Sequence, residues 1–166
     1  MSFVWVCAVL PETSVEFPYI RNEGKAGRMG SKLMAIVAEG KNGRVYLPAN
    51  DFHRAVANVP RPDDYPDSVL PTNPRDFKTP NYGMTTYADL FTPRQLTALT
   101  TFSELVGEAQ KKAEADAVAA GMFNDHIALA EGGTGARAYG EAVGVYLAFA
   151  VDKLSIYSCA LCPWLN

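Results

Sequence analysis

Two cysteines near the end of the chain, Cys159 and Cys162, have the C-x-x-C spacing found in metal and redox motifs. A structural zinc ion needs four ligands, and the candidates for the other two are Cys7, His53 and His126, which are scattered through the sequence. No second C-x-x-C is present, and the residues around the pair are apolar. We therefore interpret the two thiols as packed at a helix end, with a metal site as the weaker alternative, and expect no bound metal.

The glycine-rich basic sequence RNEGKAGRMG, residues 21–30, predicts a loop, and together with Lys32 it could contact phosphate groups. Backbone amides and cationic side chains together bind phosphates, and here Gly24, Gly27 and Gly30 alternate with the cations. The predicted contacts to the DNA backbone are Arg21, Lys25, Arg28, Lys32 and Arg44. A basic turn without a ligand is the alternative.

A second glycine-rich segment, EGGTGARAYG at residues 131–140, invites comparison with a nucleotide or S-adenosylmethionine loop. Such a loop follows a buried strand and begins a helix. This segment precedes a predicted helix but follows no predicted sheet strand, so we interpret it as a flexible loop between helices.

The sequence offers little for acid–base or nucleophilic catalysis. Neither His53 nor His126 has a partner at a spacing that indicates a catalytic triad, and no pair of carboxylates stands out. We predict no catalytic residue in the chain.

Composition indicates a globular chain that is not uniformly basic. The 166 residues are 48% hydrophobic, with a net charge of −3. Residues 19–54 carry seven Lys or Arg against three Asp or Glu, a net +4, and residues 85–125 carry three against six, a net −3. The longest apolar run, residues 142–151, is half of the roughly 20 residues that a bilayer span needs. Without a targeting segment and with an odd number of cysteines, we expect a cytoplasmic protein with reduced thiols and no membrane partner.

The N-terminal part is expected to be β-rich. Residues 3–9 are an apolar, β-branched and aromatic run typical of a strand. The runs 33–39 and 44–48 flank the sequence GKNG and predict a β-hairpin with a four-residue loop. A helix over residues 32–39 is the alternative.

A short helix over residues 50–58, with Asn50 as its N-cap, leads into a proline-rich connector. Residues 60–80 hold six prolines, which exclude regular elements because each removes a hydrogen-bond donor and favours extended backbone before it. Apolar side chains are expected to anchor the connector: Tyr65, Val69, Leu70 and Phe77.

Two long helices are predicted beyond the connector. Thr92, Pro93 and Gln95 form a complete helix start with a capping box, and Gly121 ends that helix. Thr86 and Asp89 repeat the capping pattern over one turn upstream. Apolar residues recur at helical spacing along it: Leu96, Leu99, Phe102, Val106, Ala109 and Ala113.

The second long helix follows a cap at Thr134 and carries its own stripe: Tyr139, Val143, Leu147, Ala150, Leu154 and Tyr157. Its stretch 142–151 is apolar all round, which predicts the buried centre of the domain. The expected class is α+β, with a β-rich basic part (1–58), a Pro-rich connector packed on the surface (59–84) and a helical hairpin core (85–166), together forming one compact domain.

Several long segments, in one order, resemble the large bacterial and archaeal proteins known as adenine-specific DNA methylases containing a zinc ribbon. These segments are YIRNEGKAGRMG, LMAIVAEGKNGRVYLP, NPRDFKTPNYGMTTYADLFTPRQLTALTTFSELV, GTGARAY and VYLAFAVDKL. The resemblance covers residues 17–164 and implies the central region of such a methylase. The full-length family transfers a methyl group from S-adenosylmethionine to adenine on a doubly wound α/β catalytic domain.

This chain lacks the Asp/Asn/Ser-Pro-Pro-aromatic motif that holds the flipped adenine, and it lacks the glycine-rich cofactor motif. Where the family carries paired cysteines before the YIR segment, only Cys7 is present. The resemblance therefore implies a non-catalytic accessory domain that positions DNA or braces a methylase catalytic domain, with no cofactor of its own. The alternative is a structural or protein-interaction module, with no role at nucleic acid, that self-associates as a homo-oligomer.

Overall fold

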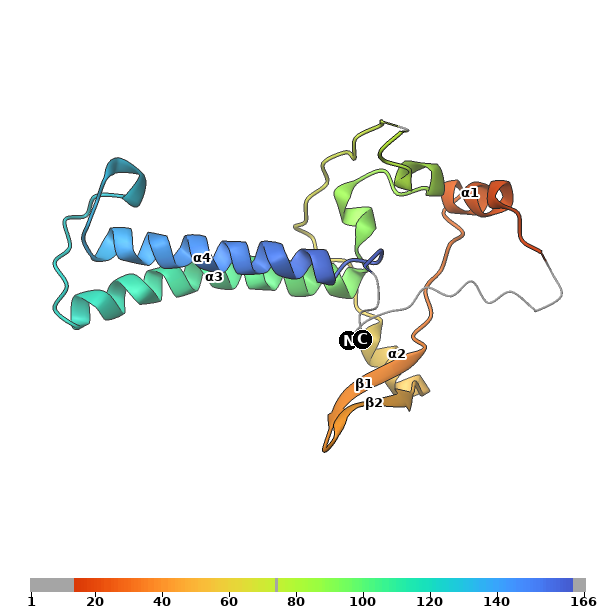
Figure 1. Ribbon diagram of the computed structural model, residues 1–166, viewed down its shortest axis with the longest axis horizontal. Helices are drawn as coiled ribbons and strands as arrows, with labels where there is room; N and C mark the ends of the chain where they lie inside the picture. The colour runs from red at the N-terminus through yellow and green to blue at the C-terminus, as the bar shows by residue number, and fades with distance from the viewer. Residues whose placement is uncertain (1–13, 74, 163–166) are drawn as a thin grey trace. The chain divides into compact units, whose positions relative to one another are not determined.

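The computed structural model describes residues 14–73 and 75–162 (Figure 1). The chain divides into two compact units, the first formed by Met1–Leu96 with Ser158–Asn166 and the second by Thr97–Tyr157. Both predicted segment boundaries, after residues 58 and 84, fall inside the first unit. The α+β class is confirmed, with helices and a two-stranded antiparallel sheet in the described residues. The strand predicted at residues 3–9 lies outside them.

The first helix in the described part of the chain is α1, Phe17–Lys25, which includes part of the segment whose glycines predicted a loop. Pro18 stands in the first turn, where its missing amide donor costs nothing. The helix continues through Gly24, which is buried, and the chain turns at Gly27 with φ of +69°. The predicted loop is therefore confined to the residues after Lys25.

The predicted β-hairpin is confirmed, and the alternative helix over residues 32–39 is excluded. Strands β1 (Ala35–Gly40) and β2 (Gly43–Pro48) pair in antiparallel register from Ala35 opposite Pro48 to Gly40 opposite Gly43. Only two residues, Lys41 and Asn42, remain for the turn, so the loop is two residues shorter than predicted. The turn closes this tightly because Gly43 adopts φ of +123°, which a side chain would oppose.

Helix α2, Asp51–Ala57, starts at the predicted cap. The Asn50 side chain accepts a hydrogen bond from the His53 amide at 2.9 Å, and His53 Nδ1 accepts one from the Asn50 amide at 3.3 Å. The His53 imidazole therefore serves as half of a capping box, a structural role that accounts for its position.

The Pro-rich connector has one strong anchor. Leu70 is 2% exposed and its amide donates to the Thr85 carbonyl at 2.8 Å, beside the bridge between Val69 and Thr86. Tyr65 and Phe77 are half-buried. Val69 is 71% exposed, so its prediction as an anchor is wrong: only its backbone is engaged.

Two short 3-10 helices follow, η1 (Thr79–Tyr82) and η2 (Tyr87–Leu90). The capping box predicted at Thr86 is confirmed, with Asp89 Oδ2 accepting from the Thr86 amide at 2.8 Å. The turn after α4 joins this part of the chain, because the Ala160 amide donates to the Leu90 carbonyl at 2.7 Å. The core of the first unit consists of Leu33, Leu70, Ala88, Leu96 and Ala160.

Helix α3, Pro93–Ala119, begins and ends as predicted. The Thr92 amide donates to Gln95 Oε1 at 2.9 Å, and the Gln95 amide approaches the Thr92 hydroxyl at 3.4 Å. At the other end Gly121 adopts φ of +90°, and the Met122 amide donates to the Ala117 carbonyl at 2.9 Å. These bonds satisfy carbonyls that the last turn leaves open.

Within the second unit, α3 lies antiparallel beside α4, Ala136–Tyr157 (Figure 1). The buried residues of α4 are small: Ala136, Ala138, Gly140 and Gly144. The prediction that residues 142–151 form a buried centre is wrong, since Tyr146 is 77% and Phe149 65% exposed. A pair of helices has one mutual face, and glycine and alanine occupy it here. No helix within the described residues is long and apolar enough to span a bilayer.

Candidate functional site

The five cations predicted to contact DNA lie on three different elements of the first unit. Arg21 and Lys25 lie one turn apart on α1, Arg28 and Lys32 follow that helix, and Arg44 lies on β2. All five are exposed. Sequence proximity therefore brings only Arg21 and Lys25 onto one helix face.

Arg28 already has an anionic partner. Its guanidinium donates two hydrogen bonds to the Glu23 carboxylate, both at 2.7 Å. The bidentate pair raises the pKa of Arg28 and lowers that of Glu23. A phosphate would have to compete with Glu23 for this fork, so Arg28 is the weakest anion contact of the five.

Helix α1 meets η1 at very close backbone range. A Cβ added to Gly24 would lie 2.3 Å from the Tyr82 carbonyl oxygen, and Gly83, with φ of +86°, faces Gly24 in turn. The Arg21 guanidinium lies 5.5 Å from the centroid of the Tyr82 ring. Two segments that carry the family resemblance, YIRNEG and PNYG, therefore meet here, and glycine is required on both sides.

A pocket of about 500 Å³ in the first unit gathers three cations. We call it the basic pocket; it is lined by Ser31, Lys32, Leu33, Arg54, Ala55, Ala57, Asn58, Val59, Thr92, Pro93 and Arg94. Its lining includes no Asp or Glu. Of the predicted set only Lys32 is present. Arg54 and Arg94 come from α2 and from the first turn of α3, and no spacing in the sequence indicates that they meet.

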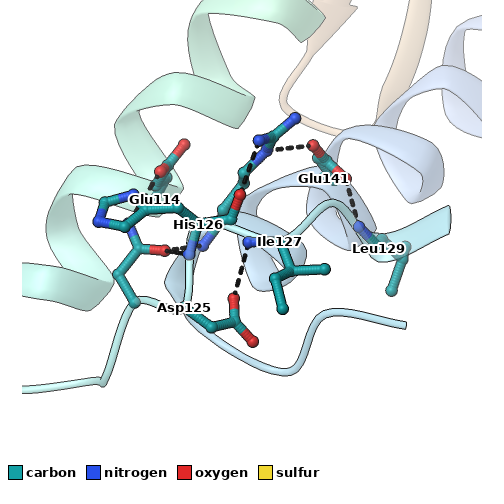
Figure 2. Close-up of polar contacts among 8 residues, drawn as sticks. Glu114, Asp125, His126, Ile127, Leu129 and Glu141 are labelled. Carbon is teal, nitrogen blue, oxygen red and sulfur yellow. Dashed lines mark hydrogen bonds and ion pairs between the residues drawn. The ribbon is translucent and has the colours of Figure 1, made fainter. Parts of the chain in front are cut away.

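The second glycine-rich segment lies in a loop that hydrogen bonds to Asp125 hold at its start and end (Figure 2). Asp125 accepts hydrogen bonds from three backbone amides, those of Ile127 at 3.1 Å, Thr134 at 3.0 Å and Gly135 at 3.2 Å. These bonds, that from Thr134 first, lower the pKa of the Asp125 carboxyl. Because α4 begins at Ala136, the N-cap position is Gly135 and not Thr134 as predicted, and Asp125 binds the amides of both residues.

Neighbouring side chains complete the same loop. Asn124 accepts from the His126 amide at 3.1 Å and from the Arg137 amide at 3.3 Å, and donates to Glu114 at 3.1 Å. Glu141 accepts from the Leu129 amide at 2.6 Å, which together with Arg137 lowers its pKa. His126 adopts φ of +58° within this network.

The network argues against a phosphate or S-adenosylmethionine loop at this position. Such a ligand would be bound by the amides at the start of the helix. Here Asp125 occupies the amides of Thr134 and Gly135, and the Phe123 carbonyl accepts from the Ala136 amide at 2.9 Å. The carboxylate and carbonyl of the chain itself stand where an anion would bind.

Cys159 and Cys162 are half-buried in the turn after α4, with the Cys162 amide donating to the Cys159 carbonyl at 3.3 Å. Burial, followed by the effect of Cys159, raises the pKa of the Cys162 thiol, which disfavours the reactive thiolate. Cys7 lies outside the described residues. Within the part of the chain that the structure describes, no group of three His, Cys, Asp or Glu side chains could hold a metal ion.

The second unit carries an apolar groove between its two helices. This arm groove has a volume of about 380 Å³ and is lined by Phe102, Leu105, Val106, Ala109, Leu147, Ala150, Val151 and Leu154. The lining contains no polar side chain. Six of the eight lining residues belong to the two predicted apolar stripes. The stripes therefore lie on one face of the helix pair, as their spacing indicated, but they line an open groove.

Comparison of the chain with protein-family models, with curated proteins and with solved structures found no match in any of the three. The resemblance to the methylase family stays a prediction based on the segments quoted above.

Proposed function

We propose that this chain is a non-catalytic accessory domain that positions DNA, resembling the middle of an adenine-specific DNA methyltransferase. The observation that carries the proposal is the clustering of cations in the first unit. Arg21 and Lys25 share a face of α1, and the basic pocket adds Lys32, Arg54 and Arg94 without a carboxylate in its lining. Exposed cations of this kind bind the phosphates of the DNA backbone and make no contact that distinguishes one base from another. Such contacts suit a role in positioning DNA.

Salt dependence tests this role. Binding of the chain to a fluorescent DNA duplex is measured by anisotropy across a series of salt concentrations. Each phosphate contact contributes about 0.9 to the slope of log K against log salt, so Arg21→Ala/Lys25→Ala lowers the slope by about 2. The matched control is Lys111→Ala/Lys112→Ala, which removes two cations from α3 in the acidic second unit and leaves the slope unchanged.

Absence of salt-dependent duplex binding, or equal effects of the two double variants, contradicts the positioning role. The non-catalytic part is tested separately with labelled S-adenosylmethionine. Methyl transfer to DNA by this chain alone contradicts it.

A second candidate function, a protein-interaction module, is favoured by the arm groove. Its occupant would be a second copy of the chain or a methylase catalytic domain. Burying such an apolar face is the main driving force for association. The groove lining runs over residues 102–109 of α3 and 147–154 of α4, which is about 12 Å of each helix.

Light scattering with a matched pair of variants tests this candidate. Ala150 lines the groove and Ala148, two residues earlier on the same helix, does not, although both are exposed. If a homo-oligomer forms through the groove, Ala150→Glu dissociates it and Ala148→Glu does not. A monomeric wild type at micromolar concentration excludes self-association and leaves a different protein as the occupant.

A further inference from the structure

The basic pocket combines three cationic side chains from three separate segments. Lys32 precedes the hairpin, Arg54 lies in α2, and Arg94 lies in the first turn of α3. The remaining polar lining, Ser31, Asn58 and Thr92, is neutral. No carboxylate lines the pocket, and although Asp51 pairs with Arg54 from outside the lining, the pocket keeps an excess of positive charge that favours an anion.

The three cations differ in how they are held. Arg54 is fixed by Asp51, at 2.7 Å from its Oδ1, and by the Ala49 carbonyl at 2.9 Å. Lys32 forms no ion pair or hydrogen bond with any described residue. Burial lowers the pKa of Arg94, which shows that its charge is partly removed from water. An anion in the pocket would supply the ionic partner that Lys32 lacks.

We propose that the basic pocket binds a phosphate group. The Lys32 ammonium and the Arg94 guanidinium match the multiply accepting oxygens of phosphate better than they match a single carboxylate, whereas the Arg54 guanidinium would have to exchange Asp51 for the phosphate. The volume of about 500 Å³ accommodates a phosphate with its attached sugar, so a backbone phosphate of DNA fits. Binding of a DNA phosphate in the pocket rests on the proposed function, and it makes the pocket one of the contacts between this chain and DNA.

Two variants with a matched control test the pocket. Lys32→Ala removes the exposed ammonium, Arg94→Gln removes a guanidinium, and Lys41→Ala removes an equivalent exposed cation from the hairpin turn, away from the pocket. Duplex binding is measured by anisotropy at several salt concentrations. Lys32→Ala and Arg94→Gln are each expected to lower the salt slope by about 1, and Lys41→Ala to leave it unchanged.

A second arm uses inorganic phosphate alone, followed by backbone amide shifts in NMR spectra of the full chain. Saturable shifts at residues 31–33 and 92–94 that disappear in Lys32→Ala support the pocket, and their absence overturns it as a site for free phosphate. The phosphate titration tests the pocket even if the wild type binds no duplex. Absence of duplex binding contradicts only the proposed DNA-positioning function.

The opposite combination is equally informative. If the duplex binds and Arg21→Ala/Lys25→Ala weakens it, while Lys32→Ala and Arg94→Gln bind as the wild type does, the DNA-positioning role stands and the pocket is overturned as a DNA contact. Unchanged thermal melting of Lys32→Ala shows that any loss of binding comes from the missing charge. Its exposed position predicts that melting is unchanged.

Discussion

The seam between α3 and α4 predicts opposite effects for one substitution at glycines of the same two helices. A Cβ at Gly140 would lie 2.8 Å from the Gln110 carbonyl oxygen and 3.0 Å from Glu114 Cβ. Gly107, in α3, has no atom within 4 Å of that position. Alanine at Gly107 therefore enters open space, while alanine at Gly140 forces the two helices apart.

The magnitudes follow from two terms. Replacing glycine by alanine inside a helix gains about 1 kcal/mol, because alanine loses less backbone entropy. Gly107→Ala keeps that gain in full. At Gly140 the gain is opposed by overpacking against backbone atoms, which costs about 1–3 kcal/mol. The difference in unfolding free energy between the two variants is this overpacking term, and the net effect of Gly140→Ala is about 1 kcal/mol of destabilisation.

Gly144 provides an intermediate case. The atom nearest to its added Cβ is Oε1 of the Gln110 side chain, at 2.9 Å. That end of a flexible side chain can rotate away, so Gly144→Ala is expected to fall between the other two variants.

The assay is urea unfolding followed by far-UV circular dichroism, with midpoints compared among the three variants and the wild type. The expected order of stability is Gly107→Ala, then Gly144→Ala, then Gly140→Ala. A midpoint for Gly140→Ala as high as that of Gly107→Ala would refute the close approach of α3 and α4.

Three further predictions concern other sites. Gly24→Ala places its Cβ 2.3 Å from the Tyr82 carbonyl oxygen and should lower the free energy of unfolding by about 1–3 kcal/mol. Gly30→Ala is the control, because open space surrounds that position, and equal melting temperatures for the two variants would contradict the close contact at Gly24. Thr79 Oγ1 is buried without a hydrogen-bond partner in the described residues, so Thr79→Val should raise unfolding free energy by about 1 kcal/mol, and a lower melting temperature would show that the hydroxyl is bonded. The pKa of Asp125 is lowered in the folded state, so its contribution to stability is present above about pH 4 and is lost as pH falls through the folded pKa. In Asp125→Asn the acid limb of melting temperature against pH should be flatter, and an unchanged limb would argue against the hydrogen bonds from Ile127, Thr134 and Gly135 to the Asp125 carboxylate.

Sequence patterns predicted the parts of the fold that depend on near neighbours. The N-cap at Asn50, the capping boxes at Thr86 and Thr92, the end of α3 at Gly121 and the β-hairpin were all recognisable, because each involves residues within a few positions of one another. Their energetics are local, so a short stretch of sequence contains the whole interaction.

Helix α1 and the loop before α4 were not predicted for the opposite reason. The glycines of the α1 segment indicated a loop, yet Gly24 is helical because it must approach the backbone of Tyr82, far along the chain. In the glycine-rich loop before α4, the Asp125 carboxylate accepts hydrogen bonds from amides nine and ten residues later. Neither partner can be inferred from composition.

The sequence by itself therefore determined where α2 and α3 begin, where α3 ends, where the β-hairpin lies, and which side chains form the apolar stripes of α3 and α4. Only the tertiary structure decided which of these side chains are buried and which line a groove or a pocket. It closed the α3–α4 contact through Gly140 and Gly144 and left the stripes lining an open groove, and it joined Arg54 and Arg94 to Lys32 in one pocket. Capping and periodicity are short-range properties of a chain, whereas burial and the meeting of like charges depend on which distant segments share a surface.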